Sequence, residues 1–179
     1  VEGYLVDDLK QVVQASKGQR LMEPCVVFDL ETTGFSAVKN EIIEIGAVKM
    51  INGEVTDRFS EFIRPTSSIP YRIEELTGIS NEMVRNARSV EEVLPEFLEF
   101  CRGCVMVAHN ADFDMGFVEE KSQRIGCYQE FTSVDTVALA RILLPDLRGY
   151  KLDQVAKHLH IPLHNHHRAV DDAECTAYI

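Results

Sequence analysis

The spacing of hydrophobic and polar positions in the first third of the chain is that of β-strands. Apolar runs rich in β-branched residues predict strands at residues 25–30 and 41–51. Between the second strand and a third at residues 55–63, Asn52-Gly53 is a strong signal for a hairpin turn. We therefore expect the sheet to begin with three antiparallel strands.

The rest of the chain has mostly the longer period of amphipathic helices. Residues 89–101 predict a helix in which Ser89 is the N-cap and Glu92 completes a capping box. Residues 104–110 predict a fourth strand, which should be parallel because a helix crosses over to reach it. Further elements are predicted as a short helix within residues 66–80, helices at 110–125, 135–143, 152–159 and 170–179, and a fifth strand at 131–134. This order predicts an α/β domain with a mixed five-stranded sheet flanked by helices.

The chain is long enough for one domain with a core of its own. We interpret residues 1–22 as an N-terminal flank or linker and residues 23–179 as the compact domain. The chain begins without Met and stops within a predicted helix, so we expect a piece of a longer protein with a truncated C-terminal helix. No apolar stretch has the length of a membrane helix, and no signal peptide opens the chain.

Charge and cysteine content narrow the classes of function. The net charge is −11, from 18 basic and 29 acidic residues. This balance argues against broad nucleic-acid binding through clustered Lys and Arg, and it suits a protein that gathers carboxylates around metal ions. The five cysteines are an odd, scattered set, so we expect no disulfide framework and a reducing cytoplasm.

Two possible metal or redox motifs have simpler interpretations. Cys101 and Cys104 form a lone CxxC, and we interpret them as buried structural thiols. A cluster of histidines has no Cys or acid at a familiar zinc spacing, so metal binding there is a minor alternative. Its members are His158, His160, His164 and His166.

Two acids, Asp29 and Glu31, end the first predicted strand in the stretch VVFDLETTG. Residues i and i+2 of a strand face the same way, so both carboxylates project together on the face of Val27. Adjacent carboxylates repel one another, and a divalent cation such as Mg²⁺ or Mn²⁺ removes that conflict. The pair also stands at the carboxyl end of its strand, where α/β sheets bind ligands. The alternative is a helix cap or a solvated turn.

Two further stretches place acids and histidines at predicted helix starts. In AHNADFDMGF, Asn110 or Asp112 caps the helix and Asp114 lies in its first turn; alternatively, both acids only favour the helix dipole. In HHRAVDDAECTA, a His and acids lie close together, with a solvated helix start as the alternative. Asp135 is interpreted as an N-cap, with a supporting role behind the site as the alternative. Together, four acids and one His fit two-metal phosphodiester hydrolysis, with the His deprotonating water.

The stretches FDLETTG, HNADFD and HRAVDD resemble, in order and spacing, the three motifs of the DnaQ-like 3′–5′ exonucleases of the DEDDh type. The resemblance covers residues 24–179. Its first motif corresponds to Asp29 and Glu31. Its second motif ends in Phe-Asp and therefore selects Asp114 over Asp112.

The third motif of this family has the form His-x-Ala-x-x-Asp. It selects His167 and Asp172 in this chain. The rival pair, His166 and Asp171, does not fit because Arg168 would then occupy the Ala position. All catalytic positions of the family pattern are present, and the resemblance therefore implies an active enzyme.

The resemblance also implies a role for each site residue. Asp29 is expected to bridge two divalent metal ions, Mg²⁺ or Mn²⁺, while Glu31 and Asp172 complete the catalytic metal site. Asp114 is expected to support the second ion, and His167 to act as the general base. The implied substrate contacts are Thr32, Phe35, Leu76, Ile79, His109 and Asn110.

Within the family, the chain most resembles the exonuclease domain of PolC-type DNA polymerase III. This likeness implies a ribonuclease H-like fold and an enzyme that proofreads newly synthesised DNA, releasing 5′-mononucleotides. The implied partners are the single-stranded 3′ end of DNA, the remainder of the polymerase chain and the replisome, in the bacterial cytoplasm at the nucleoid. No membrane is implied, and the isolated domain is expected to be monomeric. The alternatives are a free-standing nuclease acting on RNA or repair intermediates, and a non-catalytic polymerase module.

Overall fold

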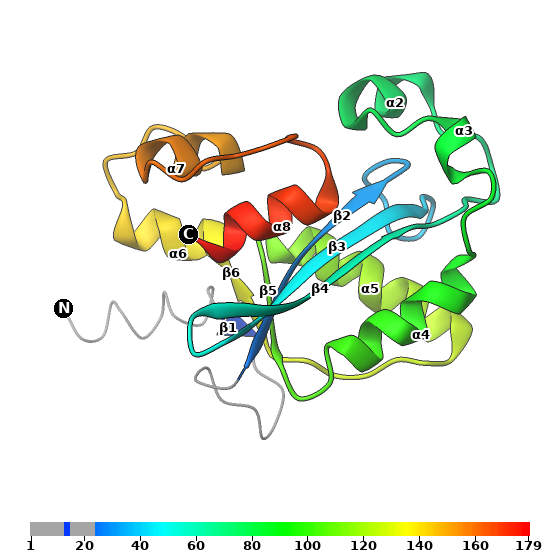
Figure 1. The fold of residues 1–179 in the computed structure, drawn as a ribbon, viewed down its shortest axis with the longest axis horizontal. Helices are drawn as coiled ribbons and strands as arrows, with labels where there is room; N and C mark the ends of the chain where they lie inside the picture. Colours follow the sequence, from blue (N-terminus) through cyan, green and yellow to red (C-terminus); the bar gives the residue numbers. More distant parts are fainter. Residues whose placement is uncertain (1–12, 15–23) are drawn as a thin grey trace.

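The computed structural model describes residues 13–14 and 24–179. The predicted flank, residues 1–22, therefore lies outside the described residues except for one short strand, Val13–Gln14. Figure 1 shows a twisted sheet through the centre of the molecule, with helices on both of its faces. The predicted α/β class is confirmed.

The sheet is mixed, with the strand order β1-β6-β5-β2-β3-β4. The β2–β3, β3–β4 and β1–β6 pairs are antiparallel, and the β2–β5 and β5–β6 pairs are parallel. Five of these strands were predicted, and β1 adds a two-residue sixth strand at the edge beside β6. The strands are β1 Val13–Gln14, β2 Cys25–Thr32, β3 Ile42–Ile51, β4 Glu54–Phe62, β5 Val105–Ala108 and β6 Ser133–Asp135.

Seven helices lie in the part of the chain that the structure describes. The connection expected to hold one short helix holds two, α2 and α3. None of these helices combines the length and apolar composition that a membrane span requires. The helices are α2 Tyr71–Thr77, α3 Asn81–Val84, α4 Val90–Phe100, α5 Ala111–Ile125, α6 Thr136–Leu143, α7 Leu152–His158 and α8 Ala169–Ala177.

Local sequence signals account for several boundaries. Asn52 and Gly53 have φ values of 54° and 81°, as the two central residues of a type I′ hairpin turn require, and the predicted hairpin is confirmed. At the start of α4, Glu92 Oε2 accepts a 2.9 Å hydrogen bond from the Ser89 N–H, as the capping box predicts.

Strand β2 presents different chemistry on its two faces. Val26, Phe28 and Leu30 belong to the main core, which includes residues of α4 and α5. The alternate positions Asp29 and Glu31 face the other side of the sheet, because successive strand residues point to opposite faces. The acids are thus fixed by a rigid central strand whose other face is fully packed.

Helix α8 covers the face that carries these acids. Gly46 on β3 is the register partner of Asp29, and a Cβ built on it would lie 2.0 Å from the Val170 backbone nitrogen. The missing side chain therefore lets the first turn of α8 rest directly on β3. This close approach brings Asp172, in the same turn, next to Asp29 and Glu31 of β2.

Cys101 and Cys104 are buried and are not joined in a disulfide, which agrees with the structural role predicted for them. Burial raises the pKa of both groups, so neither is activated as a thiolate.

Candidate active site

Three carboxylates meet where the end of β2 faces the start of α8. One oxygen from each of Asp29, Glu31 and Asp172 lies within 4.8 Å of the others. Glu31 and Asp172 are buried, and Asp29 is half-buried. All three line a cavity of about 200 Å³, together with His166 and His167. Two distant parts of the chain thus build one acidic cluster.

Asp114 joins this cluster from the first turn of α5. Its Oδ1 accepts a 3.1 Å hydrogen bond from the backbone N–H of Leu30, the residue between Asp29 and Glu31. Asp114 is buried, whereas Asp112 is exposed. The bond ties the start of α5 to the strand that carries the first two acids.

The cluster is electrostatically strained without a cation. Burial, followed by the charges of Asp114 and Glu31, raises the pKa of Asp29 well above its usual value. Burial, with the charge of Asp172 next, raises the pKa of Glu31 to about 9. Burial also raises the pKa of Asp114 to about 8. The carboxylates are therefore too close to one another, and too buried, for all of them to be ionised without a neighbouring positive charge.

This donor set fits divalent cations. Hard carboxylate oxygens are the ligands preferred by Mg²⁺ and Mn²⁺, and a positive charge would favour the ionised form of every member. Asp29, Glu31 and Asp172 are close enough to share an ion, and Asp114 is adjacent. His158, His160 and His164 belong to no such group among the described residues.

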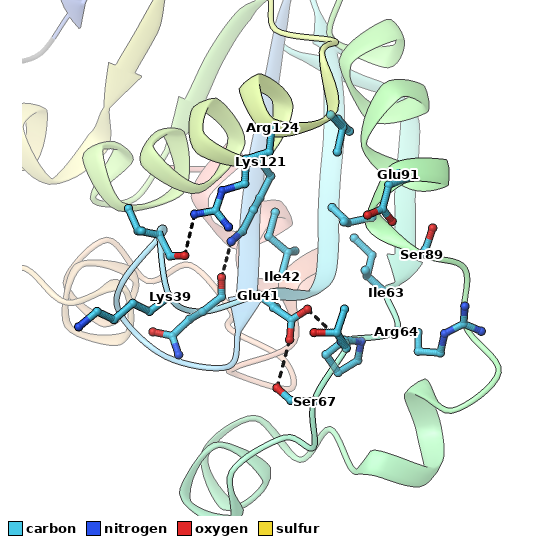
Figure 2. Close-up of a pocket in the computed structure, with 16 residues that line it drawn as sticks. Lys39, Glu41, Ile42, Ile63, Arg64, Ser67, Ser89, Glu91, Lys121 and Arg124 are labelled. Carbon is cyan, nitrogen blue, oxygen red and sulfur yellow. Dashed lines mark hydrogen bonds between the residues drawn. The ribbon is translucent and has the colours of Figure 1, made fainter.

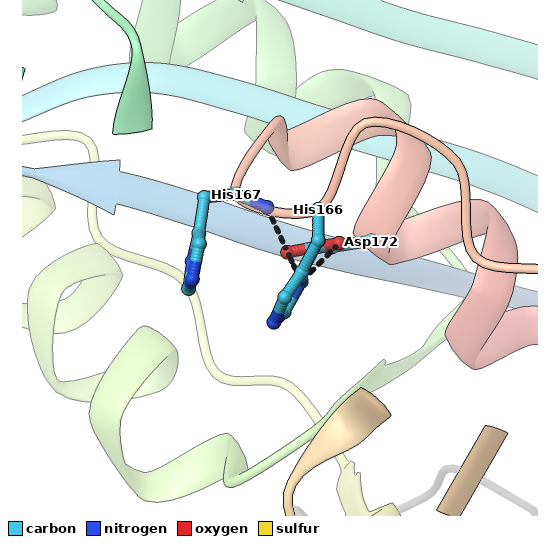
Figure 3. Close-up of side chains that lie close together, drawn as sticks. All are labelled: His166, His167 and Asp172. Atoms are coloured by element: carbon cyan, nitrogen blue, oxygen red, sulfur yellow. Dashed lines mark hydrogen bonds and ion pairs between the residues drawn. The ribbon is translucent and has the colours of Figure 1, made fainter. Parts of the chain in front are cut away.

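Two adjacent histidines contact Asp172 in different ways (Figure 3). The His166 Nδ1 lies 3.0 Å from Asp172 Oδ1, whereas His167 donates its backbone N–H to Oδ2 at 3.1 Å. Their rings are stacked with centroids 3.9 Å apart. Burial and the neighbouring His166 lower the pKa of His167, which favours the neutral imidazole that a general base requires. The structure therefore brings both histidines to the site, although the family motif selects only His167.

Sequence reasoning missed a partly buried ion pair beside the cluster. Glu44, on β3, is the register partner of Glu31 and is 1% exposed. Its carboxylate accepts Arg168 Nη2 at 2.8 Å, Arg168 Nε at 3.2 Å and the Ala169 N–H at 3.1 Å. The available signal was the stretch EIIEIGAV, in which an acid interrupts a buried strand and so needs a partner.

The residues expected to meet the terminal nucleotide have varied environments. Thr32 is buried, and its hydroxyl donates to the Gly34 carbonyl at 2.8 Å. Phe35 is 86% exposed and packs its ring against Phe113, with centroids 6.4 Å apart. Leu76 on α2 is 50% exposed. Phe35 and Leu76 therefore present free apolar surface.

Ile79 requires a correction. It is fully buried in a small core with Ile43, Ile69 and Val84. In this position its side chain supports the loop after α2 and cannot stack on a base. We therefore do not retain Ile79 as a substrate contact.

His109 and Asn110 are held at the carboxyl end of β5. His109 Nδ1 lies 2.8 Å from Thr136 Oγ1, and its Nε2 lies 2.8 Å from the Tyr150 carbonyl. Asp135 Oδ1 accepts hydrogen bonds from the Asn110 N–H at 2.9 Å and from Val137 at 3.0 Å. Asp135 is thus the predicted N-cap of α6, and it also fastens the start of α5.

A larger cavity, of about 600 Å³, lies away from the acids, between α5, the start of α4 and the loop after β2. Figure 2 shows Lys121 and Arg124 reaching from α5 to backbone carbonyls of that loop. Lys121 Nζ donates to the Ala37 carbonyl at 2.7 Å, and Arg124 Nη2 to the Val38 carbonyl at 2.8 Å. These contacts hold the loop that carries Phe35.

The chain is similar to known exonucleases and DNA polymerases. Residues 26–179 match the model of the RNase T exonuclease family. The chain is 51% identical over its whole length to a PolC-type DNA polymerase III from Clostridium perfringens and 48% identical to one from Caldanaerobacter subterraneus. It spans 12% and 13% of those two proteins.

Solved structures share the fold. Exonuclease X, in complex with 5′-overhanging duplex DNA, has a TM-score of 0.69 and 28% identity, covering 86% of both chains. The nuclease domain of 3′hExo, a DEDDh family member bound to rAMP, has a TM-score of 0.75 and 17% identity, covering 90% of this chain and 91% of the other. The fold is ribonuclease H-like, as expected, and the chain belongs to the RNase T exonuclease family.

Proposed function

We propose that this domain is a metal-dependent 3′–5′ exodeoxyribonuclease that proofreads newly synthesised DNA within a PolC-type DNA polymerase III. The observation that carries the proposal is the meeting of Asp29, Glu31 and Asp172 around one cavity, with Asp114 beside them. The high identity to PolC-type polymerases over the whole chain supports the same conclusion. The product is a nucleoside 5′-monophosphate.

The acids are proposed to hold two divalent ions, Mg²⁺ or Mn²⁺. Asp29 would be shared by both ions, Glu31 and Asp172 would complete one site, and Asp114 would support the other. Bound ions supply charge stabilisation for the phosphoryl oxygens and lower the pKa of a bound water.

His167 is proposed as the general base that accepts a proton from the attacking water. The ring lines the acid cavity, and its lowered pKa favours the neutral form, which can accept a proton. Its backbone is anchored on both sides, by Asp172 through its own N–H and by Glu44 through the next residue, Arg168. These anchors position the loop relative to the acids.

The terminal nucleotide is proposed to lie on the side of the site where β2 ends. Thr32 and the backbone that follows meet the 3′-hydroxyl, and the exposed Phe35 and Leu76 contact the base. Apolar contacts of this kind accept every base, as proofreading requires. A mismatched end frays more easily than a paired one, which supplies selectivity.

We propose that the domain works as part of the longer polymerase chain and the replisome, at the bacterial nucleoid in the cytoplasm. The remainder of the polymerase can supply the basic surface for duplex DNA that a net charge of −11 does not offer. The isolated domain is expected to be monomeric.

A comparison of substrates tests this function. The domain is incubated with Mn²⁺ and 5′-labelled single-stranded DNA, mismatched primer ends, paired primer ends or RNA. We expect stepwise shortening from the 3′ end, fastest for single-stranded and mismatched DNA. A strong preference for RNA would contradict the proofreading role.

A further inference from the structure

A second cavity opens beside the catalytic one. It has a volume of about 520 Å³, and four residues line both cavities: His109, Leu152, His166 and His167. From there it extends to the segment between α6 and α7. The two cavities are therefore direct neighbours.

The far end of this cavity is basic. Arg141 of α6 and Lys151, just before α7, both line it and are exposed. The Arg141 guanidinium lies over the Tyr150 ring at 5.8 Å, and the Tyr150 hydroxyl donates to the Leu144 carbonyl at 3.0 Å, which fixes that ring. The Tyr150 carbonyl is the partner of His109 Nε2, so this segment is tied to the catalytic wall.

These two cations have no acidic partner in the part of the chain that the structure describes. Among the described residues, neither Arg141 nor Lys151 forms a salt bridge, whereas many other arginines pair with acids. The paired arginines are Arg58, Arg85, Arg88, Arg102, Arg124 and Arg168. The net charge of the chain is −11, yet a cavity next to the acid cluster holds two cations without an acidic partner among residues 13–14 and 24–179, which favours an anionic ligand.

The two sides of the site differ in chemistry. Figure 1 places α2 on one side of the start of α8, and α6 and α7 on the other. The α2 side offers the exposed apolar side chain of Leu76, with Phe35 on the loop after β2. The α6–α7 side offers Arg141 and Lys151. The apolar α2 side therefore suits nucleobases, and the basic α6–α7 side suits phosphates.

We propose that the cavity lined by Arg141 and Lys151 binds the phosphodiester on the 5′ side of the scissile bond. The inference rests on the proposed function and gives the strand a direction. The 3′-terminal nucleotide lies toward Phe35 and Leu76, and the strand continues over α6 and α7. The ligand is a single-stranded nucleic-acid backbone, and binding to it depends on charge and salt.

Two substrates separate this subsite from the catalytic centre. One is an oligothymidylate, which has phosphates upstream of the scissile bond. The other is the p-nitrophenyl ester of thymidine 5′-monophosphate, in which an aryl group replaces the upstream strand. Both release thymidine 5′-monophosphate, and kcat/KM is measured for each with the wild-type domain and with the double variant Arg141→Ala/Lys151→Ala.

We expect the ratio of kcat/KM for the oligonucleotide to kcat/KM for the ester to fall by about tenfold in the double variant. In a plot of log affinity for the oligonucleotide against log salt concentration, the slope should become less steep by about one. Arg141→Lys/Lys151→Arg should restore most of the ratio. Lys157→Ala, which removes an exposed cation of α7 outside the cavity, should leave the ratio unchanged.

Two results would overturn the subsite. The first is an unchanged ratio in the double variant, as when kcat/KM falls equally on both substrates. The second is an equal fall of the ratio in Lys157→Ala. If the wild-type domain cleaved neither substrate with Mn²⁺, the proposed function itself would fail, and the subsite with it.

Discussion

The buried Glu44 forms a bidentate ion pair with the half-buried Arg168, whose Nη2 lies 2.8 Å and whose Nε lies 3.2 Å from Glu44 Oε1. The two residues are 124 positions apart in sequence. Arg168 follows His167, whose φ of 69° is a left-handed conformation that a non-glycine residue adopts only when its neighbours hold it. The ion pair thus connects β3 to the loop that carries the proposed base.

Glu44→Gln tests whether this pair positions the loop. Removing one charge leaves Arg168 partly buried without its partner, so we expect a loss of about 3 kcal/mol in unfolding free energy. We also expect kcat to fall at least tenfold with little change in the Mn²⁺ concentration for half-maximal activity. Urea unfolding and steady-state kinetics measure the two effects.

A second ion pair provides the matched control for Glu44→Gln. Arg58 of β4 and Glu174 of α8 also join the sheet to this helix, at 2.7 Å, but both are substantially exposed. Such pairs contribute about 1 kcal/mol or less, so Arg58→Ala should leave kcat unchanged. Equal effects of the two substitutions on kcat would refute the positioning role of Glu44.

Gly46→Ala should displace α8. Its new Cβ would lie 2.0 Å from the Val170 nitrogen, and backbone atoms of that helix cannot give way locally. We expect a loss of about 1–3 kcal/mol in stability and a large fall in kcat, since Asp172 moves with the helix. Gly116→Ala is the control, because nothing lies within 4 Å of a Cβ there and Ala favours the helix interior. The prediction fails if Gly46→Ala retains wild-type activity.

The acid cluster predicts an unusual dependence of stability on pH. The pKa of Glu31 rises from 4.5 to about 9 on folding, and that of Asp114 from 3.8 to about 8. The folded state therefore binds more protons than the unfolded state between these values, and its stability falls as pH increases through that range. Without metal, urea unfolding should show lower stability at pH 8.5 than at pH 6.

Divalent ions should remove this loss, because they stabilise the ionised carboxylates of the folded state. With saturating Mg²⁺ or Mn²⁺, stability at pH 8.5 should equal or exceed that at pH 6. The Glu31→Gln variant should have a weaker pH dependence in the absence of metal. A metal-free wild type whose stability increases from pH 6 to pH 8.5 would contradict the electrostatic picture of the site.

The two adjacent histidines permit a direct test of the base. His167→Ala should lower kcat by about 10²–10⁴-fold while metal binding survives, because a general base is lost and no ligand is removed. His166→Ala removes only the ring that contacts Asp172, and its effect on kcat should be much smaller. Mn²⁺ binding is measured by titration calorimetry for both variants. The reverse order of effects on kcat would assign the base to His166, and lost metal binding in His167→Ala would make His167 a ligand.

Much of this architecture follows from local sequence signals. Apolar runs rich in β-branched residues, the Asn52-Gly53 turn and the Ser89–Glu92 cap each depend on residues close in sequence. They predicted most of the strands and helices within a few residues. Asp29 and Glu31 could be placed on one face because strand geometry fixes the direction of alternate side chains.

The features that sequence could not supply depend on contacts between distant segments. The Glu44–Arg168 pair and the close packing of α8 on Gly46 can be recognised only once β3 and α8 are known to be neighbours. The family resemblance implied that Ile79 contacts the substrate, yet its side chain is buried in a small core. Asp172 contacts both histidines, a geometry that spacing along the chain does not determine.

The most direct test of the central claim follows a 5′-labelled single-stranded DNA incubated with Mn²⁺ and either the wild-type domain, Asp29→Asn or Asp112→Asn. The wild type and Asp112→Asn should produce a ladder that shortens from the 3′ end, with nucleoside 5′-monophosphates released. Asp29→Asn should leave the strand intact, because the carboxylate proposed to bridge both ions is gone. Undiminished shortening by Asp29→Asn, or an intact strand with the wild type, would contradict the account.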